Sequence, residues 1–186
     1  MKRWLIPILC LMAVAAIGAT TFSGNTLVRL AWAHQKTGTT TTAEDFSGDA
    51  NRLFDWDHTS GTASNQMNTL FRETVTLTNG QARTVNLATG VANAFGDTVT
   101  FDEVRFLAVT TLAANLNNIT VGNAATNEFD SWCGGTNQTI TVVPGGTWIM
   151  VAPNTAGYDS STDGNLKILN SGTNSVTYDL WVGGAN

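Results

Sequence analysis

The sequence has little charge, and the charge that it has is unbalanced. Only 12% of its 186 residues are Asp, Glu, Lys or Arg, about half of the share in an ordinary soluble domain. Nine basic residues face 14 acidic ones, which gives a formal net charge of -5. Proteins that bind nucleic acid need a basic face. The composition therefore argues against a nucleic-acid partner.

Proline and cysteine are also scarce. Three prolines beside 18 glycines exclude collagen-like and proline-rich classes. Of the two cysteines, Cys10 lies in an apolar N-terminal run and Cys133 in the motif SWCGG. If the N-terminal run is removed, Cys133 has no partner for an internal disulfide. Two interpretations stay open for it, a buried thiol and an intermolecular bridge.

Catalytic and metal-binding motifs are missing. The only histidines are His34 and His58, and the chain contains no HExxH, CxxC, P-loop or GxSxG motif. The run from Asp55 to His58 is interpreted as a solvated turn, and Asp159–Asn165 as an Asp/Gly turn, because neither has a metal site's convergent ligands. The sequence thus predicts no enzyme, no catalytic or metal-ligating residue and no cofactor.

The N-terminus has the pattern of an export signal. Lys2 and Arg3 precede the uncharged, mainly apolar run Trp4–Ala19, which is short for a membrane span. Small residues allow cleavage after Gly18 or after Ala33. Residues 1–33 are therefore predicted to be a signal peptide or, if uncleaved, an N-terminal anchor and the chain's one membrane contact. The predicted location is secreted, extracellular or at a cell surface.

Residues 34–66 are rich in Thr, Ser, Gly and Asp, and their apolar residues are sparse. This composition predicts an extended arm or loose linker. Phe46, Leu53, Phe54 and Trp56 are the exceptions. We expect them to contact a neighbouring subunit.

Residues 67–186 are predicted to form one domain of short strands. Residues 73–78 and 83–87 alternate polar and apolar residues on either side of Asn79-Gly80, which is typical of a β-hairpin. A second hairpin is predicted around the turn Ser171–Asn174. Further strands are expected at 98–101, 104–111, 118–121, 139–143, 148–152, 166–169 and 176–182, joined in part by a long connection at 123–135.

Eight or nine short strands with regularly spaced turns indicate an all-β, antiparallel β-sandwich, either jelly-roll-like or Ig-like. Residues 104–111 are apolar on both faces, which predicts a central strand. Phe129, Trp132 and Trp148 have apolar neighbours and are assigned to the core. Trp181 is expected on the less buried face of the last strand, as part of a ligand patch or a subunit contact.

From about Leu87 to its end the chain resembles small structural proteins of tailed bacteriophage virions. The phrases that carry the resemblance are AFGDTVTFDEVRFLAV, ITVGNAATNEF, ITVVPGGTWIMVAP and LKILNSGTNSVTYDLWVGGAN. The resemblance implies a capsid- or tail-associated component of a virion without enzymatic activity. The export signal points instead to a related role at a cell surface.

Two functions follow from these patterns. The first is a structural or assembly subunit, either virion-associated (capsid decoration or tail) or an exported surface or filament protein. Its partners would be further copies of itself or other virion or surface subunits. The second is a secreted carbohydrate-binding or adhesive module, whose ligand would be a glycan held by exposed tryptophans.

The cleavage prediction can be checked by intact-mass measurement on protein from its native source. A signal peptide predicts a chain that begins at Ala19 or at His34. A mass that includes Met1–Ala19 would contradict cleavage and favour the anchor.

Overall fold

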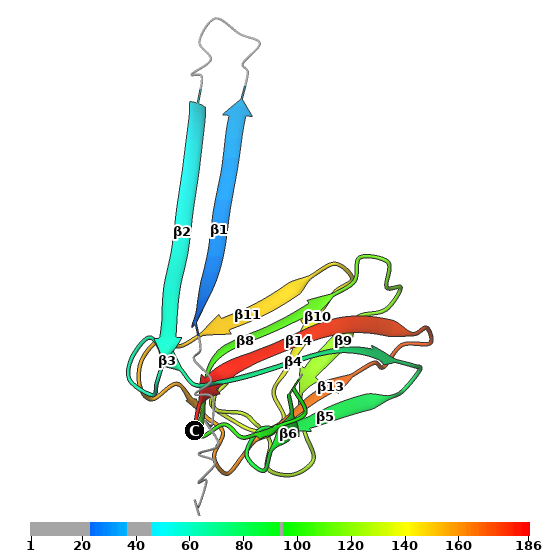
Figure 1. Cartoon of the computed structure of the whole chain (residues 1–186). Helices are drawn as coiled ribbons and strands as arrows, with labels where there is room; N and C mark the ends of the chain where they lie inside the picture. The colour runs from blue at the N-terminus through cyan, green and yellow to red at the C-terminus, as the bar shows by residue number, and fades with distance from the viewer. Residues whose placement is uncertain (1–22, 37–45, 94) are drawn as a thin grey trace, which may run out of the picture.

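The computed structural model describes residues 23–36, 46–93 and 95–186, with side chains from Asp55 onward. All fourteen regular elements in these residues are β-strands. Two packed sheets form a sandwich, and a long two-stranded ribbon stands away from it (Figure 1). The predicted all-β antiparallel sandwich with an extended arm is confirmed.

The first sheet of the sandwich has the strand order β11-β8-β14-β4, and all its pairs are antiparallel. Its strands are β4 (Thr69–Leu77), β8 (Glu103–Thr111), β11 (Thr147–Val151) and β14 (Val176–Ala185), and the short β12 (Tyr158–Asp159) also pairs with β8. Strand β8 lies inside the sheet, as its two apolar faces predict.

The second sheet has the order β10-β9-β13-β5 and is also antiparallel. Its strands are β5 (Ala82–Asn86), β9 (Ile119–Gly122), β10 (Thr139–Val142) and β13 (Asn165–Leu169). A separate small pair, β6 (Val91–Ala92) with β7 (Thr98–Val99), lies between β5 and β8 in the chain.

The strand order identifies the sandwich as a jelly roll. Of its eight main strands in chain order, the first, third, sixth and eighth form one sheet, and the others form the second. In the first sheet the last strand lies between the first and the third. Eight strands wound in two sheets in this way are the jelly-roll arrangement. This decides between the two predicted sandwich types.

Both predicted hairpins are wrong in one respect. Strand β4 pairs with β14 and β5 pairs with β13, so the Asn79-Gly80 turn crosses from one sheet to the other. The turn itself is present, with Gly80 at a φ of 69°. Likewise 170–175 joins β13 in the second sheet to β14 in the first. Strands that face each other across a core show the same polar–apolar alternation as paired strands, so the pattern alone could not separate the two.

Four such crossings lie at one end of the sandwich, here called the distal end: residues 78–81, 112–118, 143–146 and 170–175. The pairings Leu77↔Val176, Thr111↔Tyr178 and Thr147↔Thr110 place the ends of the first sheet's strands together there. The opposite end, where β8 begins, is called the proximal end.

The core fills the space between the two sheets. In β14, Val176, Tyr178, Leu180 and Val182 are fully buried, as their alternation predicts. Phe129 is also fully buried, and Trp132 and Trp148 pack against the core with their ring centroids 4.9 Å apart. These assignments to the core are confirmed.

An ion pair closes one side of the sandwich. Arg83 of β5 donates to the carboxylate of Glu73 in β4 at 3.0 Å, so the edge strands of the two sheets are bridged. The hydroxyl of Tyr178 is buried, and burial, followed by the nearby negative charge of Glu73, raises the pKa of this phenol above its usual range.

Of the two predictions for 34–66, an extended arm or a loose linker, the described residues 34–36 and 46–60 agree with an arm, because they belong to a two-stranded ribbon. Strand β1 (Ser23–Lys36) pairs antiparallel with β2 (Phe46–Ser60) along its full 14 residues. β2 then pairs in parallel with β3 (Gln66–Met67). The composition of 34–66 did not reveal the ribbon, because most of the partner strand β1, which begins at Ser23, lies in the segment predicted to be a signal. The cut after Ala33 falls inside β1, and the cut after Gly18 lies outside the described residues.

Val142 tests the core. It is 3% exposed on β10, whereas its neighbour Thr141 is exposed. Val142→Asp places an unpaired charge in the core and should abolish the cooperative thermal transition, while Thr141→Asp should leave it in place. Circular dichroism melting checks both. A normal melt of Val142→Asp would contradict the assigned core.

Candidate functional site

Arg105 stands at the point where the arm joins the sandwich. It lies near the start of β8, and its side chain is 0% exposed. A buried guanidinium is strongly unfavourable unless its donors are satisfied. The groups that accept its hydrogen bonds therefore show which segments Arg105 holds together.

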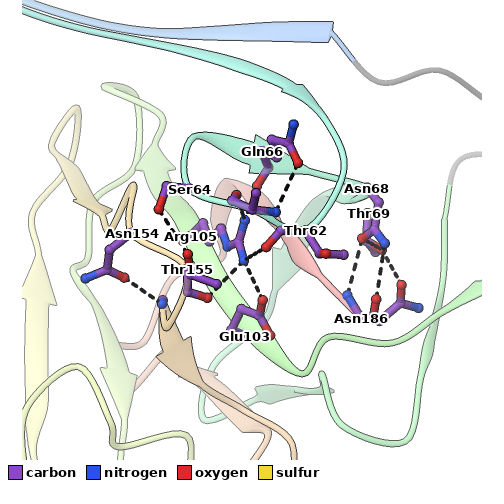
Figure 2. A network of polar contacts seen from close by, with 12 residues as sticks. Thr62, Ser64, Gln66, Asn68, Thr69, Glu103, Arg105, Asn154, Thr155 and Asn186 are labelled. Atoms are coloured by element: carbon purple, nitrogen blue, oxygen red, sulfur yellow. Dashed lines mark hydrogen bonds and ion pairs between the residues drawn. The ribbon is translucent and has the colours of Figure 1, made fainter.

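Those groups come mostly from the chain between the ribbon and the sandwich (Figure 2). The guanidinium donates to the carbonyls of Thr62 at 2.6 Å, Ala63 at 2.6 Å and Gln66. It also donates to the carbonyl of Thr155 at 2.9 Å and to the Glu103 carboxylate at 2.6 Å. One buried cation thus gathers backbone carbonyls from two loops and pairs with one carboxylate.

Other hydrogen bonds support the same junction. The Asn65 amide donates to the Pro153 carbonyl at 2.7 Å, and the hydroxyls of Ser64 and Thr155 lie 3.0 Å apart. The Ala63 amide donates to the side-chain oxygen of Gln66 at 3.0 Å. Residues 61–66 are therefore held on the sandwich, and the base of the ribbon is held with them.

His58 lies at this junction as well. The run from Asp55 to His58, interpreted from sequence as a solvated turn, lies within β2, and the His58 side chain is only 2% exposed. Burial lowers the pKa of His58, the charge of Asp57 raises it, and the charge of Arg105 lowers it. The net shift is downward, so His58 is neutral beside Arg105 at neutral pH.

At the distal end, three asparagines link three of the four crossings to one another and to β14. Asn115 exchanges two hydrogen bonds with the backbone of Thr177, at 2.8 and 2.9 Å. Asn117 donates to the Asn174 carbonyl at 2.8 Å, and the buried Asn170 donates to three carbonyls at 2.8 to 3.1 Å. Neighbouring crossings are thus linked by side chains, which stiffens this end of the molecule.

The distal end exposes apolar residues and carries no charge. Leu112 is 48% exposed, Leu116 76% and Val143 54%. None of the four crossings contains Asp, Glu, Lys or Arg. An exposed apolar group on a stiff, uncharged surface is typical of a contact site.

The sequence-predicted interaction residues lie on separate elements. Phe46, Phe54 and Trp56 are in β2, where the side chains of the two phenylalanines lie outside the described residues and Trp56 is half-buried. Trp181 is half-buried on the outer face of the first sheet, where the Arg72 guanidinium lies 4.4 Å from its ring centroid.

Hydroxyl groups line the sheet around Trp181. Thr76 and Thr177 are hydrogen-bonded at 2.8 Å, Thr110 and Thr147 at 3.1 Å, and Thr74 donates to Asp179. This outer face is mainly polar, although Leu70 and Ile149 are also exposed on it. It therefore differs in character from the apolar distal end.

Sequence reasoning missed Arg105 and the distal end. The signal for Arg105 was a single cation inside the apolar run VRFLAV. The signal for the distal end was the long charge-free stretch from Phe106 to Asn127 and a second from Ser131 to Tyr158. Neither could be assigned a place before the topology brought the turns together.

Cys133 is half-buried, and its thiol lies 3.1 Å from the Asp130 carbonyl. Within residues 55–93 and 95–186, no three His, Cys, Asp or Glu residues gather as metal ligands would. No helix in the described part of the chain is long and apolar enough to cross a membrane.

Comparison with known proteins gave no match to a family model, a curated protein or a solved structure.

Arg105→Met should release the arm's base. Methionine fills similar space but leaves the surrounding carbonyls and Glu103 without their donor, which should cost about 3–5 kcal/mol. Urea unfolding checks the stability, and hydrogen exchange should show faster exchange in residues 61–66. Arg72→Met, on the outer face, is the matched control. Unchanged protection of 61–66 in Arg105→Met would contradict the assigned role.

Proposed function

We propose that this protein is a non-enzymatic structural subunit that functions by assembly. It would function in a virion, as a capsid-decoration or tail component, or at a cell surface, as an exported surface or filament protein. The observation that carries the proposal is the ribbon, a long two-stranded arm whose base is fixed to a jelly roll by a buried arginine.

A ribbon of this kind needs a covering partner. Fourteen paired residues correspond to about 45–50 Å of extended strand. Two strands alone are at best marginally stable in water, and their outer edges leave backbone groups unpaired. Anchoring such an element to a folded body is understandable if a second protein surface stabilises it. We infer that the partner is another subunit.

The jelly-roll body agrees with this role. This architecture is used by viral capsid proteins as well as by lectins. The resemblance of the C-terminal half to phage virion proteins favours the former. The absence of catalytic motifs in the sequence favours a subunit over an enzyme. Cleavage after Gly18, or no cleavage, leaves strand β1 whole. Cleavage after Ala33 would remove residues 23–33 of β1.

A second candidate function is carbohydrate binding on the outer face of the first sheet. Trp181 and the surrounding threonine hydroxyls offer a ring and polar groups of the kind that bind sugars. Arg72 already lies over the ring of Trp181, so a sugar would have to displace it or use the other face. This candidate is therefore the weaker of the two.

The test compares the full chain with a variant that lacks residues 23–54. Both keep residues 1–22 and the junction around Arg105, so an apolar leader cannot explain a difference. We expect the full chain to form oligomers by light scattering and electron microscopy, more strongly as salt screens its net charge of -5. The deletion variant should be monomeric with the same thermal transition.

A full chain that stays monomeric at every concentration and salt level would contradict the proposal. Binding of that monomer to a glycan array, lost in Trp181→Ala, would support the carbohydrate-binding function instead.

A further inference from the structure

We propose that the free edge of strand β11 is where strand β1, from the ribbon of a second copy, adds to the first sheet. The inference rests on the proposed assembly function and names the two strands that meet. Strand addition joins main-chain amides and carbonyls, so its affinity comes mainly from backbone groups. The extended sheet would have the order β1-β11-β8-β14-β4, with β1 from one copy and the other strands from the next.

The sandwich has a closed side and an open side. On the closed side the edge strands β4 and β5 carry Arg72, Glu73 and Arg83, and the ion pair of Glu73 with Arg83 bridges them. On the other side the edge strands are β10 and β11, and neither contains a charged residue. Charged side chains on an edge strand discourage other strands from pairing with it. The open side, formed by β10 and β11, is therefore the side that favours strand addition.

Of the two open strands, β11 is the longer, and its Ile149 is 39% exposed. Among the strands that the structure describes, β11 pairs only with β8. Hydrogen bonds just beyond both ends of β11 fix the phase of this pairing. The Ala152 amide donates to the Arg105 carbonyl at 2.8 Å, and the Thr111 amide donates to the Gly146 carbonyl at 3.0 Å. Both bonds continue the register of β11 with β8.

This phase shows which backbone groups of β11 are free. Opposite residues in an antiparallel pair alternate between hydrogen-bonded and non-hydrogen-bonded positions. Counting from both ends, Trp148 and Met150 occupy the bonded positions opposite β8. Thr147, Ile149 and Val151 occupy the positions between them, so their amides and carbonyls point away from β8. The open edge thus presents a row of donors and acceptors that an extended strand can satisfy.

Strand β1 is an edge strand that can supply the matching groups. In the sheet order β1-β2-β3 it pairs only with β2 among the described strands, along the 14 residues Ser23–Lys36. Strand β2 is less suitable, because β3 pairs with it at the ribbon's base. The five residues of β11 would occupy only part of β1. A ribbon joined to a sheet in this way is no longer an isolated pair of strands, which is marginally stable at best.

Donor and acceptor belong to different molecules because of where the ribbon is held. Arg105, near the start of β8, fixes the ribbon's base through the carbonyls of Thr62 and Ala63. Figure 1 shows the ribbon pointing away from the sandwich and β11 at the edge of the first sheet. A strand and an edge at different places on each copy make a head-to-tail contact, which continues into rings or filaments.

The first test places proline in β11. Ile149→Pro removes an amide that β8 does not use, and edge strands tolerate proline at such positions. The variant should keep its thermal transition and raise the concentration for half-maximal assembly about tenfold or more, measured by size-exclusion chromatography with light scattering. Ile149→Thr keeps the amide and is the matched control, expected to assemble normally. Met150→Pro removes an amide bonded to β8 and should destabilise the fold instead.

Hydrogen exchange gives a second measurement that needs no substitution. In the full chain at a concentration where it is monomeric, the amides of Ile149 and Val151 should exchange fast and those of Trp148 and Met150 slowly. Assembly should slow Ile149 and Val151 about tenfold or more. Slow exchange of all four amides in the monomer would contradict the assigned free edge. Unchanged exchange of Ile149 and Val151 in the oligomer would overturn the acceptor.

The third test mixes two assembly-defective chains. Ile149→Pro keeps a ribbon, and the chain without residues 23–54 keeps an unaltered β11. At a concentration where each alone is monomeric, together they should form a 1:1 heterodimer. It should grow no further, because its one donor and one acceptor are already used. Absence of the heterodimer would overturn the acceptor.

The outcomes separate this inference from the proposed function. Normal assembly of Ile149→Pro, beside a monomeric deletion variant, would overturn the β11 acceptor and leave arm-dependent assembly standing. Normal assembly of the deletion variant would overturn both. Dimers of the deletion variant that are lost on adding Ile149→Pro would show that two β11 edges pair with each other, which would also overturn both.

Discussion

The hydrogen bonds of the Arg105 guanidinium determine how the two parts of this protein are joined. A buried cation does not by itself stabilise a fold, because desolvation offsets most of what its partners contribute. It does favour one arrangement, since there both terminal nitrogens of the guanidinium have acceptors, although its Nε has none. The carbonyls of Thr62, Ala63 and Gln66 are those partners. The loop at the ribbon's base is thus specified in position.

The jelly-roll topology gives the molecule two different ends. Four crossings between the sheets lie together at the distal end, and their uncharged turns form one surface there. Hydrogen bonds of Asn115, Asn117 and Asn170 hold this surface together. The chain enters the sandwich at the other end, through the Arg105 junction. This polarity is what a subunit needs if identical copies are to add in one direction.

Much of the body could be predicted from the sequence, because alternation reports burial directly: the inward residues of β14 and the central position of β8 are confirmed. The pairing of the strands could not be predicted, because strands that face each other across the core and strands that pair in one sheet share the same alternation. Both expected hairpins proved to be crossings between the sheets. The ribbon was missed because its strands lie in segments that look like a signal and a linker. The contacts of Arg105 and the gathering of the distal turns depend on distant parts of the chain meeting, which local pattern does not show.

The most direct test of the account is a photo-crosslinking amino acid placed at Ser47 in the ribbon, in the chain otherwise unchanged, irradiated at a concentration where oligomers form. The account predicts covalent dimers in which residue 47 is joined to a second copy, identified by mass spectrometry of mixed isotope-labelled and unlabelled chains. Crosslinks that reach only the same copy would contradict it.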